Sequence, residues 1–116
     1  MCQILDVTRL PYRREVIQND DRGTVVRFAL APGERTPPHN HSLPVHGRVL
    51  QGTPFHFSQK SGCQTLAAGQ EFDVPPGEFH MMGNPGSASD DAIIEDTYPP
   101  GPVEMRTEHG LFDAAP

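Results

Sequence analysis

Glycine and proline interrupt the apolar segments of this 116-residue chain at short intervals, and this pattern constrains its fold more than any other feature. The chain holds 13 prolines and 11 glycines, and most of them follow short runs that alternate between apolar and polar residues. Turn signals at such spacing are typical of an all-β sandwich or barrel. We predict strands over Thr24–Ala31, Val45–Gln51, Pro54–Ser58, Cys63–Leu66, Glu71–Val74, Glu78–Met82 and Asp91–Tyr98.

The two ends of the chain carry weaker signals. Residues 8–18 are the only stretch that leaves room for a short helix, and Pro11 argues against one. We expect the tail, residues 107–116, to be loosely ordered because Ala114-Ala115-Pro116 offers little to bury. Neither a repeat nor a linker divides the sequence, so we predict one domain over residues 1–116.

The core of such a domain is small. Leu, Ile, Val and Phe provide 25 of the 116 residues, and there is no Trp. A chain of this length buries only about two-thirds of its unfolded surface. We therefore predict a homodimer that covers exposed sheet edges and apolar faces.

Charge and cysteine content exclude several classes of protein. Nine basic and fifteen acidic residues give a net charge of −6, which disfavours a nucleic-acid partner. The sequence shows neither an apolar run of membrane-spanning length nor a secretory leader, so we expect a cytoplasmic protein without a membrane partner. Cys2 and Cys63 form no CxxC pair, and we interpret them as reduced thiols.

Four of the six histidines are candidate metal ligands. His39 and His41 are separated by one residue, and such residues point to the same face of a strand. His46 follows a bend at Pro44 and can return to that side, while His80 follows a Pro-Pro-Gly corner. Four neutral imidazoles would suit a divalent transition metal such as zinc, iron, nickel, copper or cobalt. A single HxH pair also occurs by chance on exposed strands, so the pattern around these histidines matters.

That pattern resembles the two signature motifs of the cupins. Gly33-x5-His39-x-His41-x4-His46-x5-Gly52 is similar to the first motif, and Gly69-x5-Pro75-x-Gly77-x2-His80-x3-Asn84 matches the second at every fixed position. The two motifs cover residues 33–84, and His46 stands where the family usually has Glu. The resemblance implies a double-stranded β-helix, a jelly-roll-like barrel. It also implies one divalent metal per subunit, held by His39, His41, His46 and His80.

The replacement of Glu by His changes the charge of the implied site. Four neutral histidines leave a divalent metal with its full charge of +2, which favours an anionic or chelating substrate. In the alternative, His46 does not bind the metal, and a three-histidine face with open positions remains. Three-histidine iron resembles the thiol dioxygenases, such as cysteine dioxygenase, and a diketone-cleaving cupin. Four-histidine zinc resembles certain polyketide-cyclase cupins instead.

Two further residues are candidates for catalysis. The segment Ala92–Tyr98, with the prolines after it, resembles the closing strand of cysteine-dioxygenase-like cupins, which makes Tyr98 a candidate. An ordinary strand-end tyrosine is the alternative. His56 lies between Phe55 and Phe57, and we expect both phenylalanines to face the barrel interior and His56 to face outward. With the opposite facing, His56 approaches the site as a general base.

Two residues are candidates for substrate binding because they share a facing with a predicted ligand. Met82 has the parity of His80 and is expected to line the cavity, with Phe79 and Met81 on the other side. Arg48 has the parity of His46 and can pair with a substrate carboxylate, although an exposed strand arginine is the alternative.

These observations predict a metal-dependent enzyme, with an iron-dependent dioxygenase as the leading hypothesis. Its substrates would be O2 and a small anionic or chelating molecule, and iron is favoured over zinc or nickel. A zinc- or nickel-dependent isomerase, cyclase or lyase is the first alternative, with His56 or Tyr98 moving the proton. A non-catalytic cupin that binds a small molecule or stores metal is the second.

Overall fold

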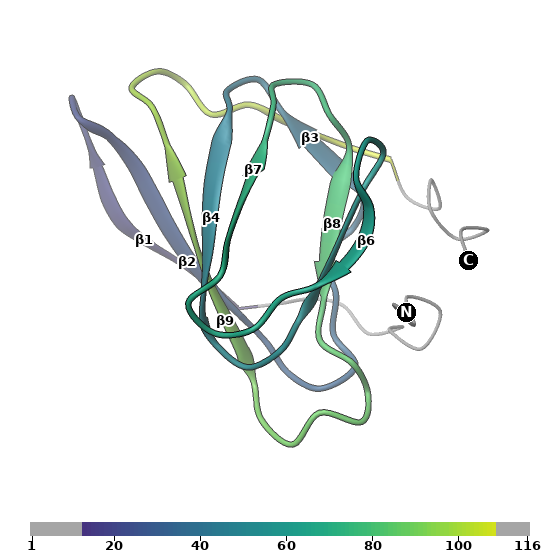
Figure 1. Ribbon diagram of the computed structural model, residues 1–116. Helices are drawn as coiled ribbons and strands as arrows, with labels where there is room; N and C mark the ends of the chain where they lie inside the picture. Colours follow the sequence, from purple (N-terminus) through teal and green to yellow (C-terminus); the bar gives the residue numbers. More distant parts are fainter. Residues whose placement is uncertain (1–12, 109–116) are drawn as a thin grey trace.

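The computed structural model describes residues 13–108, and every regular element in this range is a β-strand (Figure 1). This confirms the predicted all-β class. The strands are β1 (Arg13–Asp20), β2 (Gly23–Leu30), β3 (His39–His41), β4 (Val45–Gln51), β5 (Phe55–Ser58), β6 (Gly62–Thr65), β7 (Glu71–Val74), β8 (His80–Gly83), β9 (Ala92–Tyr98) and β10 (Met105–Thr107).

The strands form two antiparallel sheets of five that face each other (Figure 1). We call them the first sheet, in the order β1-β2-β9-β4-β7, and the second sheet, in the order β10-β3-β8-β5-β6. From β3 onward the chain passes repeatedly from one sheet to the other. Strands distant in the sequence therefore become neighbours, and the second sheet places β8 between β3 and β5.

The main core fills the space between the two sheets. Along β9 buried side chains alternate with less buried ones, as expected for a strand with one face on the core. Twelve buried residues form the main cluster: Val26, Phe28, Leu30, Val45, Val49, Leu66, Phe72, Val74, Met82, Ala92, Ile94 and Tyr98. The described residues contain no helix that is long and apolar enough to span a membrane.

The motif glycines lie at corners of the chain. Gly33, Gly52, Gly69 and Gly77 all have positive φ angles. Gly52 shows why no other residue suits its corner. Its φ is +88°, and a Cβ built on it would lie only 3.0 Å from the Ala92 Cα atom. The spacing of these glycines therefore reports real backbone turns.

The structure differs from the prediction at both ends of the described chain. Arg13–Asp20 is an edge strand that pairs with β2, although its side chains are mostly exposed and show no alternation in burial. Hydrogen bonds to β2 hold this strand, and the sequence pattern does not reveal them. Met105–Thr107 forms a second edge strand beside β3, so Thr107 does not belong to a loose tail. Residues 109–116, the rest of the predicted tail, lie outside the described residues.

The interpretation of the cysteines is wrong for Cys63, because this residue is disulfide-bonded. Cys2 lies outside the described residues. Spacing in the sequence did not reveal the bond, since the absence of a CxxC motif excludes only the local pairing.

Candidate metal centre

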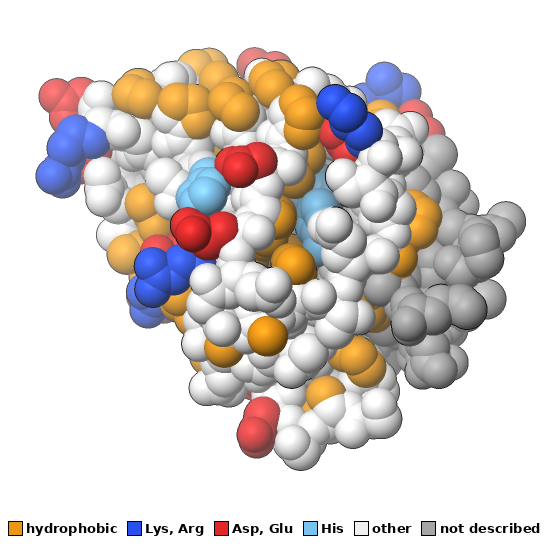
Figure 2. All heavy atoms as spheres, viewed as in Figure 1, with side chains coloured by type: hydrophobic (Ala, Val, Ile, Leu, Met, Phe, Trp, Pro, Cys, Tyr) orange, Lys and Arg blue, Asp and Glu red, His pale blue; other side chains and the backbone are white. Residues whose placement is uncertain are grey.

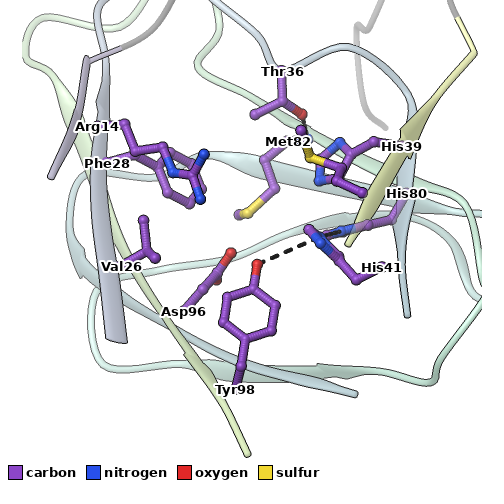
Figure 3. Close-up of a pocket in the computed structure, with 11 residues that line it drawn as sticks. Arg14, Val26, Phe28, Thr36, His39, His41, His80, Met82, Asp96 and Tyr98 are labelled. Atoms are coloured by element: carbon purple, nitrogen blue, oxygen red, sulfur yellow. Dashed lines mark hydrogen bonds between the residues drawn. The ribbon is translucent and has the colours of Figure 1, made fainter. Parts of the chain in front are cut away.

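Three histidines of the second sheet bring their ring nitrogens together. His39 and His41 lie on β3, and His80 lies on the neighbouring β8, directly opposite His39. One nitrogen from each ring can be chosen so that all three lie within 4.8 Å of one another, and all three residues are buried. Figure 3 shows the rings converging on one side of a cavity between the sheets. We call these three residues the histidine triad.

Hydrogen bonds indicate which nitrogen of each ring is free. The Nδ1 atom of His39 lies 2.7 Å from the Pro37 carbonyl oxygen, which can only accept a hydrogen bond. Nδ1 therefore carries the proton, and Nε2 keeps its lone pair. The Nε2 atoms of His41 and His80 face each other at 3.3 Å. The triad thus offers Nε2 atoms to a shared ligand.

The triad fits a divalent metal in both spacing and charge. Two nitrogens bound at about 2.1 Å to one tetrahedral metal lie about 3.4 Å apart, close to the observed separation. Burial lowers the pKa of His41 to about 4 and the pKa of His80 well below its ordinary value. Both rings are therefore neutral at pH 7 and present lone pairs, which repel each other unless a cation or proton lies between them.

A fourth histidine, His56, supports the triad from behind. It is only 3% exposed, and its Nε2 atom lies 3.0 Å from Nδ1 of His80. When His80 binds a metal through Nε2, its Nδ1–H donates to His56, which fixes the orientation of the ligand ring. The His56 ring also stacks on Phe72, with centroids 4.5 Å apart.

The expectation that Phe55 and Phe57 face the barrel interior and His56 faces outward is therefore wrong. Phe55 does not face the space between the sheets but belongs to a second buried cluster with Met81, whereas His56 points inward. The reason is the register with β8, which sets His56 opposite Met82 and Phe55 opposite Gly83. Local alternation gave two possible facings, and only the pairing with a distant strand decides between them.

Gly47 makes room for the stack on His56. A Cβ atom built on this residue of β4 would lie 2.0 Å from the Phe72 ring, far inside any allowed contact. The bare backbone at Gly47 therefore lets the Phe72 ring lie across β4. Phe72 stacks on His56, and His56 contacts His80. Gly47 lies outside the triad but therefore helps to hold the His80 ring in position.

The structure corrects the prediction that His46 is a fourth ligand. On β4 the residues Val45, Gly47 and Val49 are buried, whereas His46 and Arg48 are exposed. His46 lies between Asp73 and Glu71 of β7, with Nδ1–Oδ1 and Nε2–Oε1 distances of 2.7 Å each. Histidine and acidic side chains lie side by side over β4 and β7 (Figure 2). Because carboxylate oxygens only accept, both ring nitrogens of His46 donate in this geometry and neither offers a lone pair, and the two carboxylates raise the pKa of His46.

The facing of β4 also removes Arg48 from the candidate binding residues. Arg48 shares the outward parity of His46 and is paired in register with Glu71. The buried positions of β4 are Val45, Gly47 and Val49, so each candidate on this strand lies one residue away from a position that faces the core. A shift of one residue reverses the face of a strand.

The cavity beside the triad is narrow and mostly apolar. Its free volume is about 20 Å³, and Val26, Phe28 and Met82 line it. Tyr98 lies at its edge, with the hydroxyl oxygen 3.5 Å from Nε2 of His41 (Figure 3). Of the residues predicted for binding or catalysis, the structure therefore places Met82 and Tyr98 at the cavity and His56 behind the triad.

Two charged residues of the cavity, Arg14 and Asp96, were not predicted from the sequence. Asp96 is only 5% exposed, and burial raises the pKa of its carboxyl to about 7. It lies two residues before Tyr98 on β9, so its inward facing follows from alternation along that strand. No signal was available for Arg14, because β1 itself was not predicted.

Comparisons with known proteins address the fold. No protein-family model and no curated protein sequence matches this chain. Among solved structures, the chain is similar to a conserved protein with a double-stranded β-helix domain from Klebsiella pneumoniae. That match has a TM-score of 0.73 and 19% identity, and it covers 94% of this chain and 96% of the other.

Two further structures have the same architecture. A cupin-2 domain protein from Rhodospirillum rubrum matches with a TM-score of 0.75 and 15% identity, over 91% of this chain and 72% of the other. An oxalate oxidase in complex with glycolate matches with a TM-score of 0.66 and 22% identity, over 72% of this chain and 45% of the other. The fold is therefore the double-stranded β-helix of the cupins, as predicted, and it carries a histidine triad that can hold a metal ion.

Proposed function

We propose that this protein is a metal-dependent enzyme, and specifically an iron-dependent dioxygenase that acts on a small anionic or chelating substrate. The observation that carries the proposal is the convergence of three buried, neutral histidines, His39, His41 and His80, on one point beside a cavity. A carboxylate ligand would reduce the charge of a bound divalent ion, and the fourth motif position, His46, faces away. The triad therefore leaves the ion its full charge of +2.

An iron ion bound by three protein ligands supplies a Lewis acid with open positions and redox chemistry toward O2. The protein's own residues prepare the site for it. Pro37 holds His39 through a hydrogen bond of 2.7 Å, and His56 holds His80 through one of 3.0 Å. Rings fixed in this way need little reorganisation when they bind a metal.

The remaining side chains of the cavity set the conditions for the reaction. Val26, Phe28 and Met82 form an apolar lining that excludes water, which strengthens electrostatic interactions inside the cavity. The Tyr98 hydroxyl, 3.5 Å from Nε2 of His41, can donate a hydrogen bond to a substrate atom held beside that ring. Tyr98 is therefore the residue that we propose to hold or deliver a proton at the site.

Metal analysis followed by oxygen-electrode assays tests this function. The protein is loaded with Fe(II) and offered thiols and diketones, with the zinc-loaded protein as the matched control. We expect O2 uptake that requires both Fe(II) and a substrate. Tightly held zinc in the purified protein, with no O2 uptake after Fe(II) loading, would overturn the oxygenase proposal.

A non-redox enzyme that uses zinc or nickel is the second candidate, and Asp96 is the observation that favours it. A carboxyl with a pKa of about 7 at the cavity suits proton transfer near neutral pH. Isomerisation or lyase activity would then persist without oxygen. Turnover under anaerobic conditions distinguishes this candidate from the dioxygenase.

A further inference from the structure

Two charged side chains enter the cavity from the sheet opposite the triad. Arg14 comes from β1 and Asp96 from β9, both in the first sheet, whereas the triad belongs to the second sheet. In Figure 3 the Arg14 guanidinium and the Asp96 carboxyl point into the same space, across from the rings of His39 and His41. A molecule in this cavity would meet the triad on one side and these two groups on the other.

Neither charged group is fully satisfied by the protein. The Oδ1 atom of Asp96 is buried and makes no hydrogen bond within the described chain. Arg14 makes no ion pair among residues 13–108, although its neighbour Arg13 pairs with Asp91. A buried carboxyl oxygen without a hydrogen-bond partner costs free energy, and a ligand that donates a hydrogen bond to it would recover that cost. Arg14 is an exposed residue of β1 whose side chain lines the same cavity, so it can bind a ligand without first breaking an ion pair within the described residues.

We propose that Arg14 and Asp96 form a recognition wall that selects small carboxylates carrying a hydroxyl or amino group. This inference rests on the proposed function, because the same molecule would reach the metal at the triad. The Arg14 guanidinium would bind the substrate carboxylate, whose two oxygens match its planar pair of donors. The free Oδ1 atom of Asp96 would accept the hydrogen bond of the hydroxyl or amino group.

The charge of the cavity supports this substrate class, and its size excludes larger molecules. Its free volume of about 20 Å³ holds about one water-sized group, so even a small substrate requires the lining side chains to move aside. The triad is neutral and a bound metal would be a dication, so Arg14 adds to a positive potential that attracts an anion. Asp96 provides the acceptor that distinguishes a hydroxy or amino acid from a plain carboxylate.

Binding of two matched probes to the Co(II)-loaded full-length protein tests the wall. Glycolate has a carboxylate and a hydroxyl, whereas glycolamide keeps the hydroxyl and replaces the charged group by a neutral amide. The dissociation constant of each probe follows from the change in the visible Co(II) spectrum. We expect the wild-type protein to prefer glycolate.

Four variants separate the roles of the two residues. Arg14→Gln should reduce the preference for glycolate about tenfold, the loss expected for a charge-assisted hydrogen bond. Arg13→Gln, on the same strand but paired with Asp91, should leave the preference unchanged. Asp96→Leu should weaken both probes by a similar factor, because both use the hydroxyl, and Asp96→Asn, which keeps an acceptor, should restore binding.

The possible failures are distinguishable. A protein that binds no Co(II) at the triad would overturn the proposed function, and this inference with it. Full Co(II) occupancy, with neither probe changing the spectrum, would overturn the recognition wall alone. An Arg14→Gln variant that keeps the wild-type preference would do the same, because the carboxylate would then depend on the metal only.

Discussion

The buried histidines between the two sheets and the exposed His46 on the outer surface of the first sheet have opposite properties. The triad and His56 lie between the sheets, are buried, and have pKa values lowered chiefly by that burial. His46 lies on the outer surface of the first sheet, and the carboxylates of Asp73 and Glu71 raise its pKa. The buried histidines therefore offer lone pairs at neutral pH, whereas both nitrogens of His46 lie 2.7 Å from carboxylate oxygens, to which they donate.

The difference arises from facing and not from residue type. His41 and His46 belong to the same sequence motif and are five residues apart. Burial removes the charge from one, and two acidic neighbours stabilise the charge on the other. A histidine in a ligand motif is therefore a metal ligand only if its strand turns it away from water and from carboxylates that compete for its nitrogens.

Removing one histidine from each group should give the largest contrast. His80→Ala removes one of the three metal ligands. The binding free energy of a complete structural metal site is roughly 10–16 kcal/mol, and the loss of about one third of it lowers the metal affinity about a thousandfold or more. His46→Ala should leave the affinity within about twofold. Competition titration with a chromophoric chelator measures both, and an equal loss in the two variants would contradict the contrast.

Acid should destabilise the metal-free protein through its buried histidines, whereas protonation of the buried Asp96 carboxyl acts in the opposite direction. The pKa of His56 is about 4 in the folded state against an ordinary 6.5, so the unfolded state takes up the proton first as pH falls. The contribution of His56 to stability is thus complete above pH 6.5 and declines toward pH 4, by about 3 kcal/mol. Urea unfolding at several pH values measures the decline. A His56→Phe variant should show a shallower slope, and an unchanged slope would contradict this assignment.

The same variant tests His56 as a positioning residue. His56→Phe keeps an aromatic ring against Phe72 but removes the nitrogen beside His80. Loss of such a partner behind a ligand reduces metal affinity about 10–100-fold. His56→Gln, which restores an acceptor, should recover part of the affinity. If His56→Phe binds metal as tightly as the wild type, the contact between His56 and His80 has no role in the site.

The smallest effect should come from the surface histidine. A raised pKa means that His46 stabilises the fold below pH 6.5, and that this contribution is lost as pH rises through its folded-state pKa. His46 and its acidic partners are exposed, so His46→Ala should lower the free energy of unfolding by less than about 1 kcal/mol at pH 6 and should not change it at pH 9. Thermal unfolding at the two pH values measures it, and a larger loss at pH 9 would give the wrong sign.

Much of the architecture could be predicted from the sequence because turns are local. Gly52 and Gly77 mark corners through backbone conformations that other residues avoid, and His39, His41 and His80 follow from motif spacing. The facings of His46 and His56 could not be predicted, because they depend on the pairing of β4 and β5 with strands distant in the sequence. The edge strand that supplies Arg14 has no apolar pattern of its own.

Some sequence predictions remain predictions. The homodimer is one of them, and the exposed Val16 and Ile17 on edge strand β1 are where a partner would find apolar surface. The cytoplasmic location is another. Sedimentation and fractionation experiments address these two points directly.

Anomalous diffraction from crystals grown with Fe(II), Zn(II) or Co(II) tests the central claim most directly. We predict one strong peak per chain, about 2.1 Å from the Nε2 atoms of His39, His41 and His80. His46 should remain between Asp73 and Glu71 without metal. A peak bound to His46, or a triad without metal at saturating concentrations, would contradict the claim that facing alone separates the ligand histidines from the surface one.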